Sequence, residues 1–209
     1  MSEPTPPNEA APENSWEQRY RTGDLPWDTG KPDKHLERII EQYRVVPCPA
    51  LEIGCGTGTN AVWLGQQGFD LTVVDVAPTA VEAARKAVEA AGLKARLEVA
   101  DFLAGPVLPP GSVSFAFDRG CFHAFDYHRE RAAFAGRVAD ALASGGLWLS
   151  LCGSTDEGSR QPGPPQRSAL DIAAAVEARF EILLLEATRF EGKLEATPRA
   201  WACVMKKRG

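Results

Sequence analysis

LEIGCGTG, residues 51–58, is a short apolar segment followed at once by three glycines. We interpret it as a buried strand that enters a tight turn and then a helix, because glycine permits such a turn and lets a ligand approach the backbone. Gly54, Gly56 and Gly58 give the spacing G-x-G-x-G. In a dinucleotide fingerprint the third glycine would fall where Thr59 stands. The spacing therefore favours a cofactor other than a dinucleotide.

The order of strand, turn and helix repeats along the chain around this loop. Helices are predicted over residues 15–22, 32–43, 61–67, 78–91 and 129–144, and from 168 onward. Strands are predicted for seven segments, which are ALEIG (50–54), FDLTVVDV (69–76), ARLEVAD (95–101), SVSFAFD (112–118), GGLWLSLCG (145–153), FEILLLEATRF (180–190) and RAWACVMKK (199–207).

The connections between these elements predict the fold class. Strands that alternate with helices form a parallel sheet with helices on both faces. The last two strands are joined by too few residues for a parallel crossover, so they must form an antiparallel hairpin. We therefore predict an α/β fold, a doubly wound, mostly parallel seven-stranded sheet that ends in a C-terminal antiparallel hairpin. This is the Rossmann-like architecture of class I methyltransferases.

Acidic residues stand at the ends of two predicted strands. Asp75 lies 17 residues past Gly58, where a carboxylate can accept hydrogen bonds from both ribose hydroxyls of a cofactor; Val76 follows it and is included in the predicted site. Asp101 ends the next strand and can accept from the amine of adenine, with the backbone or ring of Phe102 beside the base. A solvated strand-end or turn aspartate is the alternative for each.

Glu52 lies within the apolar strand before the glycine loop. An unpaired buried carboxylate is costly, so Glu52 needs a cationic partner. The ammonium group of a bound S-adenosylmethionine is the first candidate, and an internal arginine or lysine is the second. Together with the loop residues Gly54, Cys55 and Gly56, Glu52 predicts a site for S-adenosylmethionine as the cofactor.

Composition divides the chain into three parts. Residues 1–13 are rich in proline, glutamate and alanine and are predicted to be a disordered tail, because they cannot bury enough apolar surface. Residues 14–46 contain the two N-terminal helices, and residues 47–209 form the cofactor-binding domain.

The net charge and the cysteines limit the possible partners. A formal charge of −5 argues against nucleic acid, and the chain has neither a long apolar run for a membrane nor a visible secretory signal. The five cysteines are widely spread and form neither a metal ligand set nor a disulfide framework. We therefore expect a cytoplasmic protein without a metal site, acting on a small molecule, with a monomer slightly favoured.

Residues 48–206 resemble the class I S-adenosylmethionine-dependent methyltransferases. Three segments resemble the thiopurine S-methyltransferase family more closely, and the N-terminal one is also similar to the plant halide/thiol methyltransferases. They are SWEQRYRTGDLPWDTGKP (15–32) with Pro26-Trp27-Asp28 and Gly30, FAFDRGCFHAFDYHRERAAFAGRVADAL (115–142) with Asp118-Arg119-Gly120, and LSLCGSTDEGSRQPGPPQRSALDI (149–172) with Gly163-Pro164-Pro165. The glycine loop and the CFH after Asp118-Arg119-Gly120 depart from the mammalian thiopurine enzymes, so the acceptor stays open.

The resemblance implies roles for several residues. The N-terminal segment, residues 14–46, is expected to fold over the cofactor as a lid through Trp16 and Trp27, which could instead be ordinary core aromatics. Asp118 is expected at the cofactor. Arg119 is expected near the acceptor, where it can stabilise a thiolate, although a salt bridge to Asp118 or Glu52 is the alternative.

The predicted chemistry is methyl transfer to a small thiol or other soft nucleophile. A thiol needs little help from a base at neutral pH, and His123, either a base or a packed histidine, is the one candidate base. Other acceptor classes (a metalloid, a halide, or a small oxygen or nitrogen nucleophile), a non-catalytic S-adenosylmethionine-binding protein, and an NAD(P)-dependent oxidoreductase remain alternatives.

Overall fold

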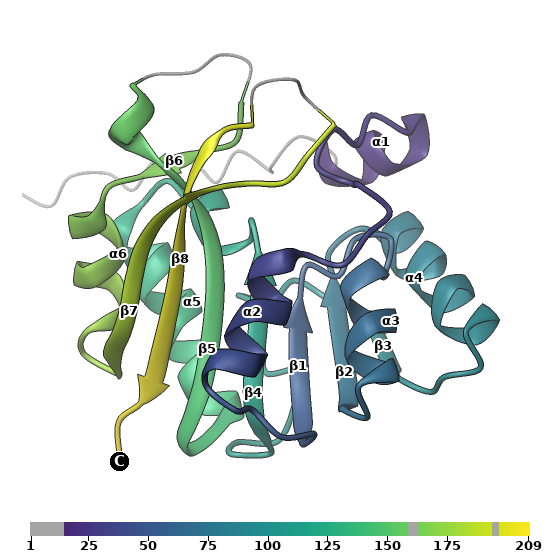
Figure 1. Ribbon diagram of the computed structural model, residues 1–209, viewed down its shortest axis with the longest axis horizontal. Coiled ribbons are helices and arrows are strands. Elements are labelled where there is room, and N and C mark those ends of the chain that lie inside the picture. The colour runs from purple at the N-terminus through teal and green to yellow at the C-terminus, as the bar shows by residue number, and fades with distance from the viewer. Residues whose placement is uncertain (1–14, 159–162, 194–196) are drawn as a thin grey trace, which may run out of the picture.

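The computed structural model describes residues 15–158, 163–193 and 197–209 (Figure 1). The tail predicted for residues 1–13 and a short part of the Gly/Pro-rich loop lie outside the described residues. No helix in the described ranges is long and apolar enough to cross a membrane. The five cysteines are all free thiols.

The described chain alternates helices and strands as expected. The helices are α1 (Ser15–Thr22), α2 (Lys34–Gln42), α3 (Thr59–Gln66), α4 (Pro78–Ala90), α5 (His128–Ala141) and α6 (Ala169–Val176), with short 3-10 turns η1 (Phe122–Ala124) and η2 (Thr155–Glu157). The strands are β1 (Pro49–Ile53), β2 (Asp70–Asp75), β3 (Arg96–Val99), β4 (Val113–Arg119), β5 (Leu142–Ser154), β6 (Gln166–Arg167), β7 (Phe180–Arg189) and β8 (Arg199–Lys207).

The sheet has the strand order β3-β2-β1-β4-β5-β8-β7. The first five strands in this order are parallel, and β8 is antiparallel to both β5 and β7. The predicted α/β fold with a C-terminal hairpin is confirmed. One difference is β6, an eighth strand of two residues that pairs with the end of β5. The carbonyl oxygen of Pro165, the residue before β6, lies 2.2 Å from where a Cβ on Gly153 would stand, so glycine is needed for this approach.

Several predicted boundaries move in the structure, and two of these changes have a clear local cause. The fifth helix ends at Ala141 rather than Ser144, and β5 begins at Leu142, whose backbone is extended. The second helix begins after Asp33, whose carboxylate accepts from the His35 N–H at 2.9 Å, rather than at Pro32. Asp33 is the N-cap because a carboxylate satisfies a free amide of the first turn, which proline cannot do.

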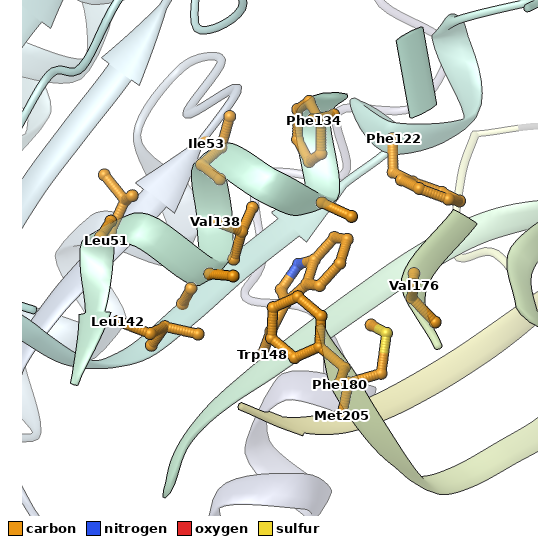
Figure 2. Packing of buried hydrophobic residues seen from close by; sticks show 14 of the residues in the cluster. Leu51, Ile53, Phe122, Phe134, Val138, Leu142, Trp148, Val176, Phe180 and Met205 are labelled. Atoms are coloured by element: carbon orange, nitrogen blue, oxygen red, sulfur yellow. The ribbon is translucent and has the colours of Figure 1, made fainter. Parts of the chain in front are cut away.

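Helices cover both faces of the sheet (Figure 1). On one face α2, α3 and α4 bury an apolar cluster that includes Leu36, Leu64 and Val88. On the other face α5 and α6 cover a second cluster, in which Trp148 is surrounded by aromatic and aliphatic side chains (Figure 2). Because Leu36 is fully buried, α2 is an element of the core. Any lid in residues 14–46 is thus restricted to the part before α2.

The substitution Gly58→Ala should lower the free energy of unfolding by about 2–4 kcal/mol, because it adds strain at a positive φ and overpacks a helix contact. Gly58 has φ +84°, and an added Cβ would lie 2.7 Å from the Cα of Ala84. Urea unfolding followed by circular dichroism measures the change. The matched control is Gly136→Ala within α5, where no atom lies within 4 Å and alanine should stabilise by about 0.5–1 kcal/mol. Equal effects of the two changes would contradict this account of Gly58.

Candidate active site

The glycine loop joins β1 to α3 at the carboxyl edge of the parallel strands. The Gly54 N–H donates to the Val74 carbonyl at 2.7 Å, and the Gly56 N–H donates to Asp75 Oδ2 at 3.0 Å. A Cβ on Gly54 would lie 2.1 Å from the Sγ of Cys121. The loop is therefore held tightly between β2 and the segment after β4, and glycine is required at this position.

Asp75 lies at the end of β2 with its carboxylate fixed by backbone amides. Oδ1 accepts from the Ala77 N–H at 3.0 Å, and Oδ2 accepts from Gly56. Burial raises the pKa of Asp75, and these N–H donors lower it. Each oxygen keeps a lone pair for a further donor, such as a hydroxyl group. Val76 beside it is an exposed apolar side chain.

Asp101 and Phe102 follow β3, and the structure separates their roles. Asp101 is exposed, and its Oδ1 accepts from the Leu103 N–H at 2.9 Å. The Phe102 ring is buried and packs against Phe134 with ring centroids 5.1 Å apart. The ring of Phe102 therefore belongs to the core, which does not support its predicted place beside adenine. Asp101 and the local backbone remain at the edge.

Glu52 is buried within β1 and has an incomplete set of partners. The side chain of Asn60 lies beside its carboxyl group and lowers the pKa of that group, and Oε2 is buried without a partner among the described residues. Burial raises the pKa of Glu52 to about 8. The alternative of an internal arginine or lysine as partner is not supported, because no ion pair joins Glu52 to such a residue in the described part of the chain, and Arg119 pairs with Asp33. A buried oxygen without a partner fits a site for a ligand that brings a donor.

Asp118 is fully buried, and its hydrogen bonds are made inside the protein. It accepts from the N–H groups of Cys121 and Phe122 at 3.2 and 3.0 Å and from the Trp148 indole at 2.9 Å. Burial raises its pKa to about 6. This environment does not fit the predicted contact with the cofactor. Asp118 instead fixes the chain that follows β4, which carries His123.

Arg119 joins three segments at the end of β4. Its Nε lies 2.6 Å from Asp33 Oδ2, Nη2 donates to the Glu191 carbonyl, and Nη1 donates to the Trp27 carbonyl at 3.4 Å. The guanidinium also stands over the ring of Phe190, 5.3 Å from its centroid. The anticipated salt bridge is therefore made, with Asp33 rather than with Asp118 or Glu52. Arg119 holds the N-terminal segment and the β7–β8 connection against the sheet.

His123 is buried in η1, and its ring is neutral. The Gly153 N–H donates to Nδ1 at 2.7 Å, so Nδ1 carries no proton. Burial lowers the pKa of His123 to about 3, and the positive charges of Arg167 and Arg119 contribute to the shift. The ring packs edge-on against Phe190 at 5.7 Å. This is a packed histidine, the second of the two interpretations from the sequence.

The aromatic residues of the N-terminal segment gather beside the glycine loop. Trp16 and Tyr20 both pack edge-on against Trp27, with centroids 5.6 and 6.2 Å apart. The Tyr20 hydroxyl lies 3.0 Å from where a Cβ on Gly56 would stand. The two tryptophans are half-buried and belong to neither apolar cluster, so the structure brings them together at the predicted site.

Polar contacts fasten this segment in two further places. The Glu17 carboxylate accepts from the Thr79 N–H at 3.0 Å and from its hydroxyl at 2.6 Å, at the start of α4. The Thr57 hydroxyl of the glycine loop donates to Asp28 Oδ2 at 3.1 Å. Because α4 has no side-chain cap of its own, Glu17 supplies one from α1.

Sequence reasoning missed three residues of the site, Tyr20, Asn60 and Arg167. Tyr20 stands four residues from Trp16 in the helix predicted over residues 15–22, so the two side chains share one face, and this spacing could have indicated Tyr20. Asn60 comes two residues after the last glycine of the loop, and a polar side chain so close to the predicted cofactor site could have been included in it. Arg167 lacks a sequence signal, because its proximity to His123 arises only when β6 pairs with β5.

Comparison with known proteins gives a family. The model of the thiopurine S-methyltransferase family matches residues 11–204. The "Probable thiol methyltransferase 2" of Arabidopsis thaliana is 30% identical over 153 residues, which is 72% of this chain and 65% of that protein. The chain thus matches slightly less than two thirds of the length of this relative.

Two solved structures have a similar fold. One is described as "Conversion of a Disulfide Bond into a Thioacetal Group during Echinomycin Biosynthesis", with a TM-score of 0.75, 24% identity, and 88% of this chain and 84% of that chain covered. The other is the Burkholderia thailandensis 1,6-didemethyltoxoflavin-N1-methyltransferase with 1,6-didemethyltoxoflavin and S-adenosylhomocysteine, with a TM-score of 0.72, 17% identity, and 100% and 94% coverage.

The mostly parallel sheet with its terminal hairpin and glycine loop is the fold of class I S-adenosylmethionine-dependent methyltransferases. Within that class, the chain belongs to the thiopurine S-methyltransferase family. The family indicates S-adenosyl-L-methionine as the cofactor. The residues at the sheet edge fit this group, since Glu52 Oε2 lacks a donor and the Asp75 carboxylate is held beside the glycine loop.

The substitution Asp75→Ala should weaken the binding of S-adenosylhomocysteine by about 2 kcal/mol, through loss of charge-assisted hydrogen bonds. Isothermal titration calorimetry measures the affinity. For the unchanged protein we expect a micromolar dissociation constant, or a binding free energy of about −8 kcal/mol. Asp70→Ala is the matched control, because Asp70 is exposed at the opposite end of the same strand. Unchanged affinity in Asp75→Ala would remove this residue from the site.

Proposed function

We propose that this chain transfers the methyl group of S-adenosylmethionine to a small acceptor that is already ionised, or ionises readily, near neutral pH, such as an aliphatic or heterocyclic thiol. The single observation that carries the choice of acceptor is the state of His123. Its Nδ1 is occupied by the Gly153 N–H, and its pKa is lowered to about 3. A group with so low a pKa is a poor base at pH 7. The acceptor must therefore be deprotonated without help from His123.

The other polar groups on the acceptor side support the same proposal. Asp118 is fully buried and used by internal donors, and Asp33 is paired with Arg119. Neither carboxylate is placed to take a proton from an acceptor. An aliphatic alcohol, which needs a dedicated base, is therefore a poor candidate, whereas a thiol supplies a few per cent of thiolate at neutral pH.

The charge around His123 favours an anionic acceptor. Arg119 and Arg167 each lower the pKa of His123, so both stand near it. Their guanidinium groups are mostly buried, with about one eighth of each side chain exposed. Two cations in a poorly solvated region stabilise a nearby anion more than they would in water. We infer that they stabilise a thiolate and raise its population at this edge of the sheet.

The cofactor side rests on four groups. When bound, S-adenosylmethionine supplies a methyl group on a positively charged sulfur that a nucleophile attacks. Glu52 would accept from the ammonium group, Asp75 from the ribose hydroxyls, and Asp101 from the adenine amine, with Val76 beside the base. The glycine loop leaves the space that the ligand needs.

The N-terminal segment before α2 would enclose the ligand as a lid. Its side-chain hydrogen bonds to the glycine loop and to α4 are made by Asp28 to Thr57 and by Glu17 to Thr79. Its aromatic cluster of Trp16, Tyr20 and Trp27 lies beside the loop. A lid of this kind excludes water and holds the acceptor in line with the methyl group.

The pH dependence of turnover tests the choice of acceptor. With a panel of thiols, kcat/KM should rise with pH and its midpoint should follow the pKa of each thiol. His123→Asn should change kcat/KM by less than about threefold, because an amide oxygen can still accept from Gly153, whereas loss of a true base lowers the rate by about 10²–10⁴-fold.

Arg119→Ala should cost about 2 kcal/mol of transition-state stabilisation. A fixed pH profile together with an inactive His123→Asn variant would favour a histidine-based mechanism, and turnover confined to halide, metalloid, oxygen or nitrogen acceptors would replace the thiol.

The lid is tested by truncation. Removal of residues 1–30 should reduce the affinity for S-adenosylhomocysteine by about tenfold or more, or about 1.4 kcal/mol, while circular dichroism still shows the folded sheet. Removal of residues 1–13 is the control and should leave affinity and turnover unchanged. Full activity in the longer truncation would show that the segment is not a lid.

A further inference from the structure

Asn60, in the first turn of α3, contacts both sides of the candidate site. Its Oδ1 accepts from the backbone N–H of Asp33 at 2.9 Å. Its side chain also lies beside the carboxyl group of Glu52 and lowers the pKa of that group. Because the oxygen end of the amide accepts from Asp33, the nitrogen end is the one that can donate to Glu52.

The contact with Asp33 leads directly to the acceptor side. Asp33 Oδ1 caps α2 through the His35 N–H, and Oδ2 holds Arg119 Nε at 2.6 Å. Asp33 is buried and Arg119 is largely so, so a shift of either changes the position of the other. A short series of contacts therefore runs from Glu52 through Asn60 and Asp33 to Arg119, and its last two links are hydrogen bonds.

The contact with Glu52 bears on the charge of that carboxyl group. Burial raises the pKa of Glu52 to about 8, the adjacent amide of Asn60 lowers it, and the negative charge of Asp75 on β2 raises it. The thiols of Cys55, in the glycine loop, and Cys121, after β4, also face it. In the free protein at pH 7 Glu52 is thus mostly protonated. It must lose that proton to pair with an ammonium group, and the Asn60 donor reduces the cost of doing so.

We propose that Asn60 is a positioning residue shared by the two halves of the site, whose amide nitrogen prepares Glu52 for the ammonium group of the cofactor and whose amide oxygen anchors the Asp33–Arg119 pair on the acceptor side. The proposal rests on the proposed function, since it takes S-adenosylmethionine as the ligand. Removal of the amide nitrogen makes ionisation of Glu52 harder. Removal of the amide oxygen loosens the capped start of α2 that carries Asp33.

The test is the affinity of S-adenosylhomocysteine for the full-length protein and for Asn60→Ala between pH 6.5 and 9. At each pH the dissociation constant of Asn60→Ala is divided by that of the unchanged protein. Ionisation of the ligand affects both constants equally and cancels from this ratio. If loss of the donor raises the pKa of Glu52 by about one unit, the ratio is about tenfold at pH 7 and falls to about twofold at pH 9. A ratio that stays constant with pH, or stays near one, would overturn the proposal, since a purely structural defect does not titrate with Glu52.

Two further variants keep the test decisive. Asn60→Asp retains an oxygen for the Asp33 N–H and is similar in size, so it serves if the alanine variant does not fold, and its ratio should depend on pH at least as steeply.

Asp33→Asn keeps the N-cap and the backbone N–H to Asn60 but removes the negative charge from Arg119. Its ratio should be independent of pH, while the KM for the acceptor rises by about tenfold, as expected for the loss of one charge-assisted contact. A pH-dependent ratio in Asp33→Asn, or an unchanged acceptor KM, would show that the two ends of the amide do not serve separate sides. Failure of the unchanged protein to bind S-adenosylhomocysteine at any pH would instead contradict the proposed function.

Discussion

The cost of burying a carboxylate shapes the whole edge of the sheet where the strands end. Four acidic side chains are buried there, and an unpaired buried charge is among the most expensive features a fold can contain. Asp118 is satisfied by internal N–H donors, Asp33 by Arg119, and Asp75 by the amides of Gly56 and Ala77. Glu52 alone among these four keeps a buried oxygen without a partner. A ligand that donates a hydrogen bond to Glu52 Oε2 would satisfy this buried oxygen.

The proposed site has two sides, which differ in how their carboxylates are paired. On the proposed cofactor side, Glu52 and Asp75 flank the glycine loop. On the proposed acceptor side, Arg119 and Arg167 supply positive charge, and His123 is held neutral by burial and by the Gly153 N–H. An electropositive region without a titratable base near pH 7 suits a nucleophile that arrives ionised. The pairing of the buried charged groups therefore also limits which acceptors the site would suit.

Much of this edge could be predicted from the sequence, because strand ends and glycine turns are local features. The positions of Asp75 and Glu52 follow from the strands that carry them, and the terminal hairpin follows from its short connection. The pairing of Arg119 with Asp33 spans 86 residues and depends on how α2 packs, which no local pattern encodes. The state of His123 and the place of the Phe102 ring likewise depend on burial, which only the folded structure determines.

The proposed function requires that the free oxygen of Glu52 pairs with the ammonium group of the cofactor. The most direct measurement is a thermodynamic cycle, in which calorimetry gives the affinities of S-adenosylhomocysteine and of its analogue without the amino group for the unchanged protein and for Glu52→Gln. If the two groups pair, the changes are not additive, and the coupling free energy is about 2–3 kcal/mol. Losses that simply add, with a coupling near zero, would contradict the claim and place the ammonium group elsewhere.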